Sequence, residues 1–276
     1  MTLAAGSVTA LEIDAAGTFG NLGFATDRDT GDTDLGSGSY LWDARLALSG
    51  TVLDGFLLTG AYERDSVLGD TFAVTLGYSG QIMSVSAGPF VGFLLDSDNP
   101  YLLKPGLSAQ LRAELWETGF VSLETDVTLD PQLSTSSTDF RQFRITPRAG
   151  IYLPNIITSL EFDRSTLFYS DGSDTTIDRR SEYALANEIF QKAIPYRILL
   201  RFAYRSQLKR FADGTKHALG AAVFTPGITY TPAETVTLRA QLENGIYVFG
   251  REELLGEIET DRYFLRATLG VTLQLP

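Results

Sequence analysis

The chain has one histidine and no cysteine, so few kinds of side-chain chemistry are open to it. Without cysteine there are no disulfides, thiolate nucleophiles or cysteine-ligated metals, and one histidine excludes a multi-histidine zinc or iron site. Serine or aspartate catalysis uses a histidine as general base, which leaves His217 as the candidate. Asp213 precedes it by four residues, but no serine or amide side chain follows closely. We expect no enzyme, metal or cofactor, and keep a hydrolase using His217 as an alternative.

A second set of candidates consists of charged residues that recur at every second or fourth position in otherwise apolar segments. Arg197, Arg201 and Arg205 are four residues apart, and Glu124 and Asp126 are two apart. In an extended strand, residues two or four apart lie on the same face. A face of this kind attracts and orients hydrated ions and polar solutes.

The elements that carry these charges are predicted to be strands. The odd positions from 263 to 275 are all apolar, whereas the even positions between them include Arg266, Thr268 and Gln274. Only an extended strand places neighbours on opposite faces in this way. The same alternation recurs and predicts fourteen strands, at about 8–19, 39–49, 55–64, 71–79, 81–94, 103–115, 120–129, 140–152, 156–168, 181–191, 196–205, 217–230, 235–248 and 262–275.

The strand lengths and the connections favour a membrane barrel over a soluble sandwich. Soluble strands average about five to six residues, whereas a membrane-spanning strand needs about 9–11. Short turns alternate with long connections, which are 20–38, 65–70, 95–102, 130–139, 169–180, 206–216 and 249–261. This asymmetry is typical of outer-membrane barrels, with short periplasmic turns and longer external loops. We therefore expect one all-β domain over 1–276, a closed antiparallel barrel with an even strand number.

Through this pattern, and not through a fingerprint motif, nearly the whole chain resembles the monomeric fourteen-stranded porins among the Gram-negative outer-membrane β-barrels. The resemblance implies a multi-pass protein of the cell outer membrane and favours a monomer over an oligomer. It also implies passive diffusion of small hydrophilic solutes or ions, with outer-membrane lipid and lipopolysaccharide as partners. A non-transporting structural, adhesin or assembly barrel is the alternative. Such barrels usually end in an aromatic residue, whereas this chain ends Leu273-Gln274-Leu275-Pro276.

Strand parity predicts which charged side chains face the lumen. The acidic candidates are Glu12, Asp14, Asp43, Glu124 and Asp126, and the basic candidates are Arg144, Arg148, Arg197, Arg201, Arg205, Arg239 and Arg266. The acidic set lies mostly on early strands and the basic set on later ones, so a closed barrel could set one wall against the other. By resemblance to porins, such walls form a constriction with a transverse field. The alternative is local pairing across strands, for example of Arg144 or Arg148 with Glu161 or Asp163, which stiffens the wall.

The net charge of −12 resides in the predicted long connections, which hold 7 basic and 19 acidic residues. This acidity argues against nucleic acid as a partner. It fits either cation attraction at the barrel mouth or a solvated loop. The segment 27–34 is rich in aspartate but lacks the glycine and the closing glutamate of a calcium loop.

Two positions and one predicted strand fit the pattern poorly. Arg164 and Asn187 fall on the predicted lipid face, and the alternation in 217–230 does not decide which face is apolar.

Overall fold

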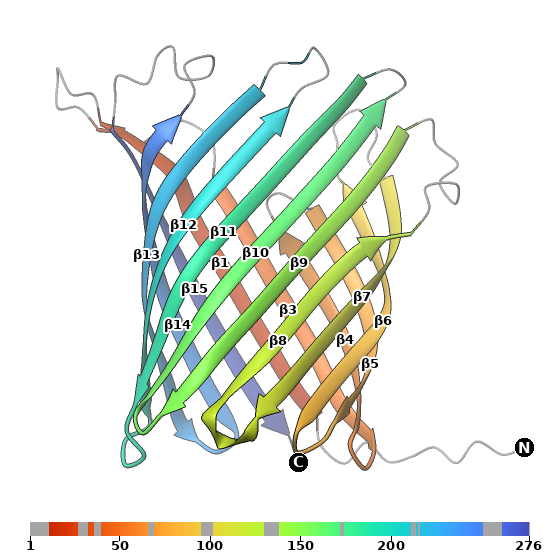
Figure 1. Cartoon of the computed structure of the whole chain (residues 1–276), viewed down its shortest axis with the longest axis vertical. Coiled ribbons are helices and arrows are strands. Elements are labelled where there is room, and N and C mark those ends of the chain that lie inside the picture. Colours follow the sequence, from red (N-terminus) through yellow and green to blue (C-terminus); the bar gives the residue numbers. More distant parts are fainter. Residues whose placement is uncertain are drawn as a thin grey trace, which may run out of the picture.

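In the computed structural model, one antiparallel sheet closes on itself to form a barrel (Figure 1). The structure describes residues 11–26, 33–35, 40–65, 69–94, 102–129, 138–171, 174–210, 214, 216–250 and 261–275. The strands are β1 (Leu11–Thr26), β2 (Thr33–Leu35), β3 (Tyr40–Leu53), β4 (Phe56–Asp65), β5 (Gly69–Ser79), β6 (Met83–Leu94), β7 (Leu102–Leu115), β8 (Gly119–Thr128), β9 (Thr138–Leu153), β10 (Ile156–Asp171), β11 (Asp174–Phe190), β12 (Tyr196–Arg210), β13 (Lys216–Ala233), β14 (Val236–Gly250) and β15 (Asp261–Leu275). A 3₁₀ turn, Trp116–Thr118, joins β7 to β8.

Among the described residues, no helix has the length and apolar character needed to cross a membrane.

Each long strand pairs with its neighbours in the chain, and the first and last long strands pair with each other. Leu11 lies opposite Leu275, and the β1–β15 ladder closes the sheet. β2 pairs only with the end of β1, where Phe24 lies opposite Leu35. Fourteen strands therefore form the wall, as the alternation predicts, and β2 is an addition at the rim. Closure leaves no open sheet edge, so the backbone groups of the wall are paired within the protein, as hydrocarbon requires.

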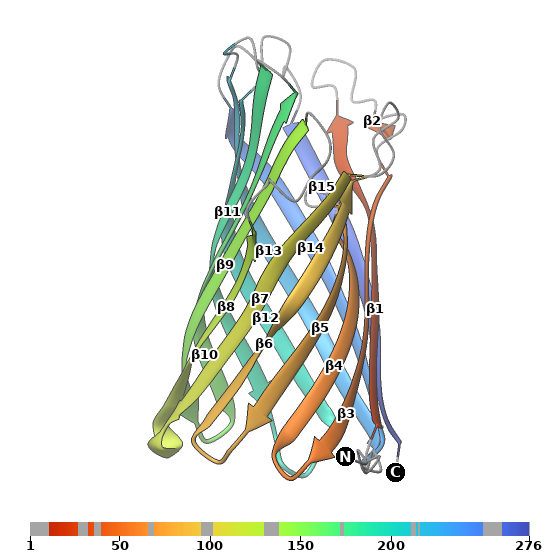
Figure 2. The same ribbon diagram turned by 90° about the vertical axis from the view of Figure 1, so that its right-hand side faces the viewer.

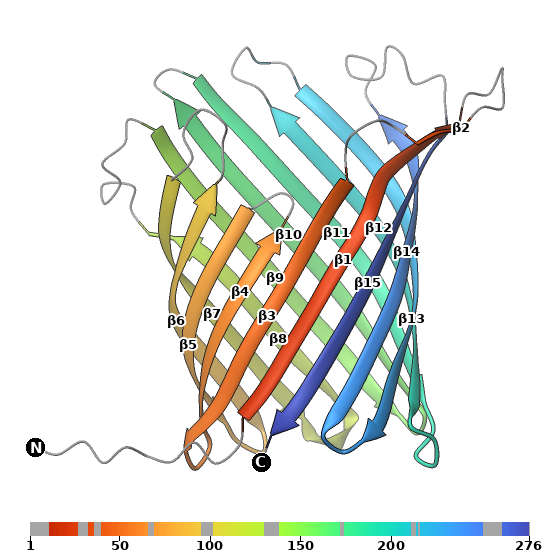
Figure 3. The ribbon, with the colours of Figure 1, turned by 180° about the vertical axis from the view of Figure 1, so that it is seen from behind.

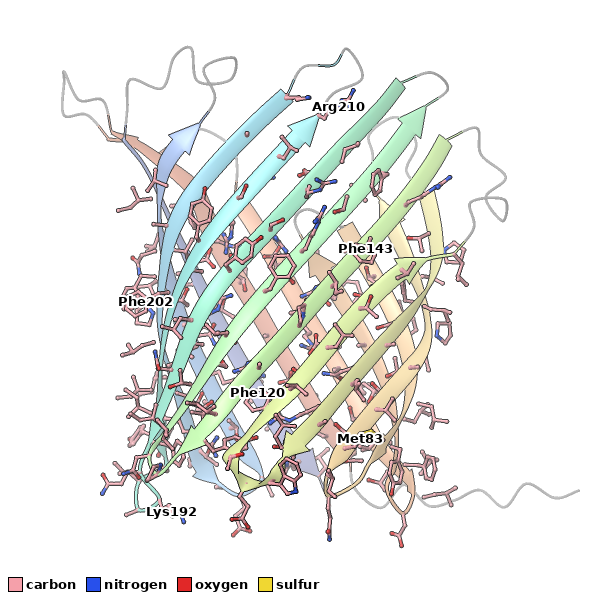
Figure 4. The ribbon with its side chains drawn as sticks, viewed as in Figure 1. Met83, Phe120, Phe143, Lys192, Phe202 and Arg210 are labelled. Carbon is pink, nitrogen blue, oxygen red and sulfur yellow. The ribbon has the colours of Figure 1, made fainter. Side chains whose placement is uncertain are left out.

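The outer face of the wall is apolar. Leu160 is 65% exposed and Phe202 is 53% exposed, and Figure 4 shows Phe202 on the outside of the barrel. Large apolar side chains on the same parity are exposed on most strands, among them Leu46, Phe72 and Leu269. In hydrocarbon these side chains are favourably placed, because a membrane barrel carries its apolar band outward.

Aromatic side chains gather at both ends of this apolar band. At the short-turn end, Tyr196 stacks on Tyr230 with ring centroids 4.7 Å apart, and Phe56 lies 5.3 Å from Tyr78. Nearer the loop end, the ring of Tyr183 lies 4.8 Å from that of Phe162. Such girdles mark the two membrane–water interfaces of outer-membrane barrels.

Among the side chains that the structure describes, three phenylalanines on the inner face are only 2% exposed, and each covers a glycine on the neighbouring strand. Phe90 lies opposite Gly106, Phe120 opposite Gly150 and Phe264 close to Gly245. A Cβ atom at any of the three glycines would lie within 2.4 Å of the ring. The glycines therefore leave the space in which these rings lie flat against the inner wall.

The strands on one side of the barrel extend beyond the predicted ends. β10 to β13 reach higher than β4 to β8 at the loop end (Figure 2). The predicted loops at 169–180 and 206–216 are mostly wrong, because β10 runs to Asp171, β11 starts at Asp174, β12 ends at Arg210 and β13 starts at Lys216. Above the bilayer both faces of a strand meet water, so the apolar alternation stops while the hydrogen-bonded ladder continues.

The structure also settles the faces that the sequence leaves open. In β13, Ala221 and Val223 face inward and are buried, whereas Phe224 faces outward. Asn187 faces outward and accepts a hydrogen bond of 2.9 Å from the Thr158 hydroxyl, which satisfies its side-chain oxygen in an apolar setting. The acidic segments at 27–32 and 251–260 lie outside the described residues.

Candidate functional site

Eight charged side chains form a continuous chain of ion pairs along the inner wall. Acids and arginines alternate along it, and it runs from β9 past the β15–β1 closure to β3. We call this set the lumen ion-pair chain, and its members in order are Arg148, Glu161, Arg201, Glu182, Arg205, Glu243, Arg266 and Asp43.

The first half of the lumen ion-pair chain is closely packed. Arg148 Nε lies 3.0 Å from Glu161 Oε1, and Arg201 Nε lies 2.9 Å from Glu161 Oε2. The other end of the Arg201 guanidinium places Nη2 2.6 Å from Glu182 Oε1. Arg205 Nε lies 2.5 Å from Glu182 Oε2. Glu182 is therefore held between two arginines, and its side chain is only 10% exposed.

The second half carries the pairing across the closure of the barrel. Arg205 Nη2 lies 2.9 Å from Glu243 Oε2. Glu243 Oε1 lies 3.7 Å from Arg266 Nη1, and Arg266 also pairs with Asp43. Because Arg266 is on β15 and Asp43 on β3, this last pair passes over β1. Each charge in the chain thus has an opposite charge beside it.

Local structure explains how these long side chains reach one another. Arg201 and Arg205 are four residues apart on the inward face of β12, and Glu182 lies opposite Arg205 in the β11–β12 ladder. The inward positions between them are small, because Ala184 and Ala186 are buried on β11. Small neighbours leave the guanidinium groups free to lie along the wall.

A separate ion pair crosses the lumen. Arg144 Nη1 lies 3.1 Å from Glu63 Oε1, although β5 to β8 lie between β9 and β4 in the sheet. Figures 1 and 3 show β9 and β4 on opposite sides of the barrel. Arg144 Nε also lies 3.4 Å from Asp163 Oδ2 on the neighbouring strand. At the level of this pair, the lumen is narrow enough for an arginine side chain from one wall to meet a glutamate side chain from the other.

The remaining predicted site residues lie on the same inner face. Arg239 pairs with Asp14, and Arg197 Nη1 lies 2.9 Å from Glu188 Oε1 near the short-turn end. Glu124 accepts a hydrogen bond of 2.8 Å from Gln110, and Glu12 accepts one of 3.3 Å from Gln274. Asp126 lies opposite Arg144 in the β8–β9 ladder.

All seven predicted arginines are therefore in ion pairs with carboxylates. This arrangement differs from two separated walls of opposite charge, because acids and arginines alternate around much of the wall. The local pairs considered from the sequence are present, with Arg144 beside Asp163 and Arg148 beside Glu161.

The site residues predicted from the sequence do not include two acids on which the lumen ion-pair chain depends, Glu182 and Glu243. Both lie on the inward parity of predicted strands, and Glu243 is four residues from Arg239, so the alternation itself could have identified them. The predicted set also lacks a cluster near the short turns, in which Arg112 lies 2.7 Å from Glu114 and Tyr152 donates a 2.6 Å hydrogen bond to Glu114.

The structure does not describe the side chains of the alternative catalytic pair, Asp213 and His217. Asp213 lies outside the described residues, and so does the side chain of His217, whose backbone belongs to β13. Within the described part of the chain, no three histidine, aspartate or glutamate side chains cluster in a way that could hold a metal ion.

Comparison with known proteins supports the fold alone. No protein-family model matches the chain, and a search of curated proteins finds no match. Among solved structures, the chain is similar to a bacterial polysaccharide outer membrane secretin, at 10% identity, covering 96% of this chain and 98% of that one with a TM-score of 0.55. It is also similar to the CymD monoaromatic hydrocarbon channel, at 8% identity, and the match covers 96% of this chain and 88% of that one with a TM-score of 0.52. The outer membrane protein OmpT of Vibrio cholerae matches at 12% identity over 96% of each chain, with a TM-score of 0.49. The chain thus has the fold of the Gram-negative outer-membrane β-barrels, closed here by fourteen strands.

Proposed function

We propose that this protein is an outer-membrane channel for passive diffusion of small hydrophilic solutes or ions, and that it is not an enzyme. The observation that carries the proposal is the lumen ion-pair chain, which lines the inner wall with charge from β9 to β3. Small barrels that serve no passage fill their interior with packed side chains. A wall of arginines and carboxylates instead offers hydrogen-bonding groups to water and to hydrated solutes.

The Arg144–Glu63 pair supports a size limit on what passes. It joins opposite sides of the barrel at 3.1 Å, so it divides or narrows the lumen at that level. Close opposite charges in this position favour small polar solutes, because an apolar solute would have to displace the water that solvates them.

The test is single-channel conductance of the refolded protein in a planar bilayer. Heat-dependent gel mobility first establishes that the barrel has folded. Stable open steps are expected, because the lumen is lined with hydrated charge. A folded and inserted protein that shows no steps would contradict the proposal and favour a non-transporting structural or assembly barrel.

Ion selectivity tests the role of the predicted site residues. Replacing Arg197, Arg201 and Arg205 by glutamine removes three positive charges from one inward face and leaves the acids Glu161, Glu182 and Glu243 in place. The reversal potential in a salt gradient should then shift towards cation preference. An unchanged reversal potential in a folded triple variant would show that these arginines do not face the conducting path.

A further inference from the structure

Glu63, the acid that meets Arg144 across the lumen, has a second arginine beside it. Arg45 lies directly opposite Glu63 in the β3–β4 ladder, and directly opposed residues have Cβ atoms about 4.5–5.5 Å apart. Glu63 nevertheless pairs with Arg144, whose Nη1 lies 3.1 Å from Glu63 Oε1. Figure 3 shows β3 beside β4, with β9 on the far side of the barrel. The acid therefore pairs across the lumen although an arginine of the adjacent strand is within reach.

Arg45 is a lumen-facing cation that has no ion-pair partner among the described residues. It is two positions from Asp43, which pairs with Arg266 on the inner wall, so Arg45 and Asp43 share a face of β3. The Arg45 residue is exposed, and no ion pair joins it to a described carboxylate. The next inward pair in the same ladder is Ala47 opposite Ala61. These small side chains leave the space beside Arg45 open.

Arg144 also has carboxylates on its own side of the barrel. Its Nε lies 3.4 Å from Asp163 Oδ2 on β10, and Asp126 on β8 lies directly opposite it. The Thr146 hydroxyl donates a hydrogen bond of 2.8 Å to the same Asp163 oxygen, which holds that carboxylate beside Arg144. When the contact with Glu63 is broken, the Arg144 guanidinium therefore still has two carboxylates on its own wall.

The contacts at both ends of the Arg144–Glu63 pair permit an exchange of partners. In the closed arrangement, Glu63 pairs with Arg144 and Arg45 stays in water. In the open arrangement, Glu63 pairs with Arg45, and Arg144 remains with Asp163 and Asp126. Glu63 keeps one ion pair in either arrangement, and its side chain is 41% exposed. Water therefore screens both pairs, and the two arrangements are close in free energy.

We propose that the Arg144–Glu63 pair is a latch that opens the lumen by this exchange of partners, and that Arg45 is the residue that holds it open. This inference rests on the channel function proposed above and adds the regulation of the same site. Only side chains rotate, so the ladders of the barrel wall stay as they are. Exposed side chains rotate within picoseconds to nanoseconds, and a current recording therefore measures the conductance averaged over both arrangements.

The first test compares the averaged single-channel conductance of two variants of the full-length refolded protein, each of which removes one positive charge from the lumen. Arg144→Gln should raise the conductance, because the closed arrangement is lost. Arg45→Gln should lower the conductance, because losing an exposed ion pair changes the ratio of open to closed arrangements about two- to fivefold. Arg45→Lys keeps the charge and should conduct nearly as the unaltered protein does.

The opposite signs of the two effects separate the latch from simple electrostatics. Loss of positive charge alone would change the conductance in the same direction in both variants. In a Glu63→Gln background, Arg45→Gln should no longer lower the conductance, because Glu63 is the residue through which Arg45 acts. A conductance that rises or stays unchanged in Arg45→Gln would overturn the proposal.

A second test, urea unfolding in lipid vesicles, does not depend on conduction. In an Arg144→Gln background, Glu63→Gln should lower the urea midpoint, because Glu63 then pairs with Arg45. In a background that carries both Arg144→Gln and Arg45→Gln, Glu63→Gln should leave the midpoint unchanged. Equal shifts in the two backgrounds would show that Arg45 does not receive Glu63 and would overturn the latch. A folded barrel that does not conduct contradicts the channel function instead, and the two unfolding backgrounds still decide whether the partners exchange.

Discussion

Arg144 on β9 and Glu63 on β4 meet at 3.1 Å although four strands separate β9 from β4 in the sheet. The pair connects two strands that are not hydrogen-bonded neighbours in the sheet. It therefore shapes the interior without contributing to any ladder. Arg148, four residues along the same face of β9, pairs instead with Glu161 on the adjacent strand.

This difference gives a matched pair of variants for the channel. Arg144→Ala should raise single-channel conductance, because it removes the side chain that crosses the lumen. Arg148→Ala removes the same atoms from the same strand but breaks only a pair along the wall, so its effect should be smaller. Conductance in symmetric salt is the measurement, and a larger effect from Arg148→Ala would contradict the view that Arg144 narrows the path.

Glu182 should contribute more to stability than any other acid of the lumen ion-pair chain. Its side chain is 10% exposed and contacts both Arg201 and Arg205. Glu182→Gln leaves two guanidinium groups, which are only 19% and 14% exposed, with one partner fewer, and the free energy of unfolding should fall by about 3 kcal/mol. Urea unfolding of the barrel in lipid vesicles measures this change in the free energy of unfolding.

Glu188 supplies the control for Glu182 on the same strand and the same face. Its partner Arg197 is 58% exposed, so water screens the pair. Glu188→Gln should cost less than about 1 kcal/mol. If both substitutions lower stability equally, burial is not what makes the Glu182 contacts matter.

The Phe264 ring lies where a Cβ atom of residue 245 would be, at 1.9 Å. Gly245→Ala should therefore destabilise the barrel by about 1–3 kcal/mol through overpacking. Gly60→Ala is the control, because no atom outside its immediate neighbours lies within 4 Å of the added Cβ. If the clash between the added Cβ atom and the Phe264 ring is the cause, combining Gly245→Ala with Phe264→Leu should recover part of the lost stability. Heat-dependent gel mobility in a urea series measures the stability of the two single variants and the double variant.

The alternation predicts all fourteen wall strands because the bilayer demands an apolar outer face along each of them. It also places Arg201, Arg205 and Glu161 on the inner face for the same reason. The Arg144–Glu63 contact has no such local signal, because it depends on how close two distant walls approach. The strand ends near Arg179 and Arg210 are missed because the alternation ends where the strand leaves the hydrocarbon, while the ladder does not.

The pattern of ion pairs in the lumen also predicts which ions the channel prefers. The seven predicted lumen arginines are in ion pairs, and Arg45, on the same face as Asp43, lies opposite Glu63 in the β3–β4 ladder. Glu124 and Glu12, in contrast, have only neutral amide partners among the described hydrogen bonds. Uncompensated carboxylates in a confined path attract cations, so the channel should be weakly cation-selective, and the preference should fall as salt rises and screens the charges.

Glu124→Gln should reduce this cation preference, because it removes one of the uncompensated charges from the inner wall. Glu117→Gln is the matched control, since Glu117 lies in the turn of the same β7–β8 hairpin and not on the lumen face. Reversal potentials across a tenfold salt gradient distinguish the two. Anion selectivity in the unaltered protein, or an equal shift from both substitutions, would mean that charge outside the inner wall sets the selectivity.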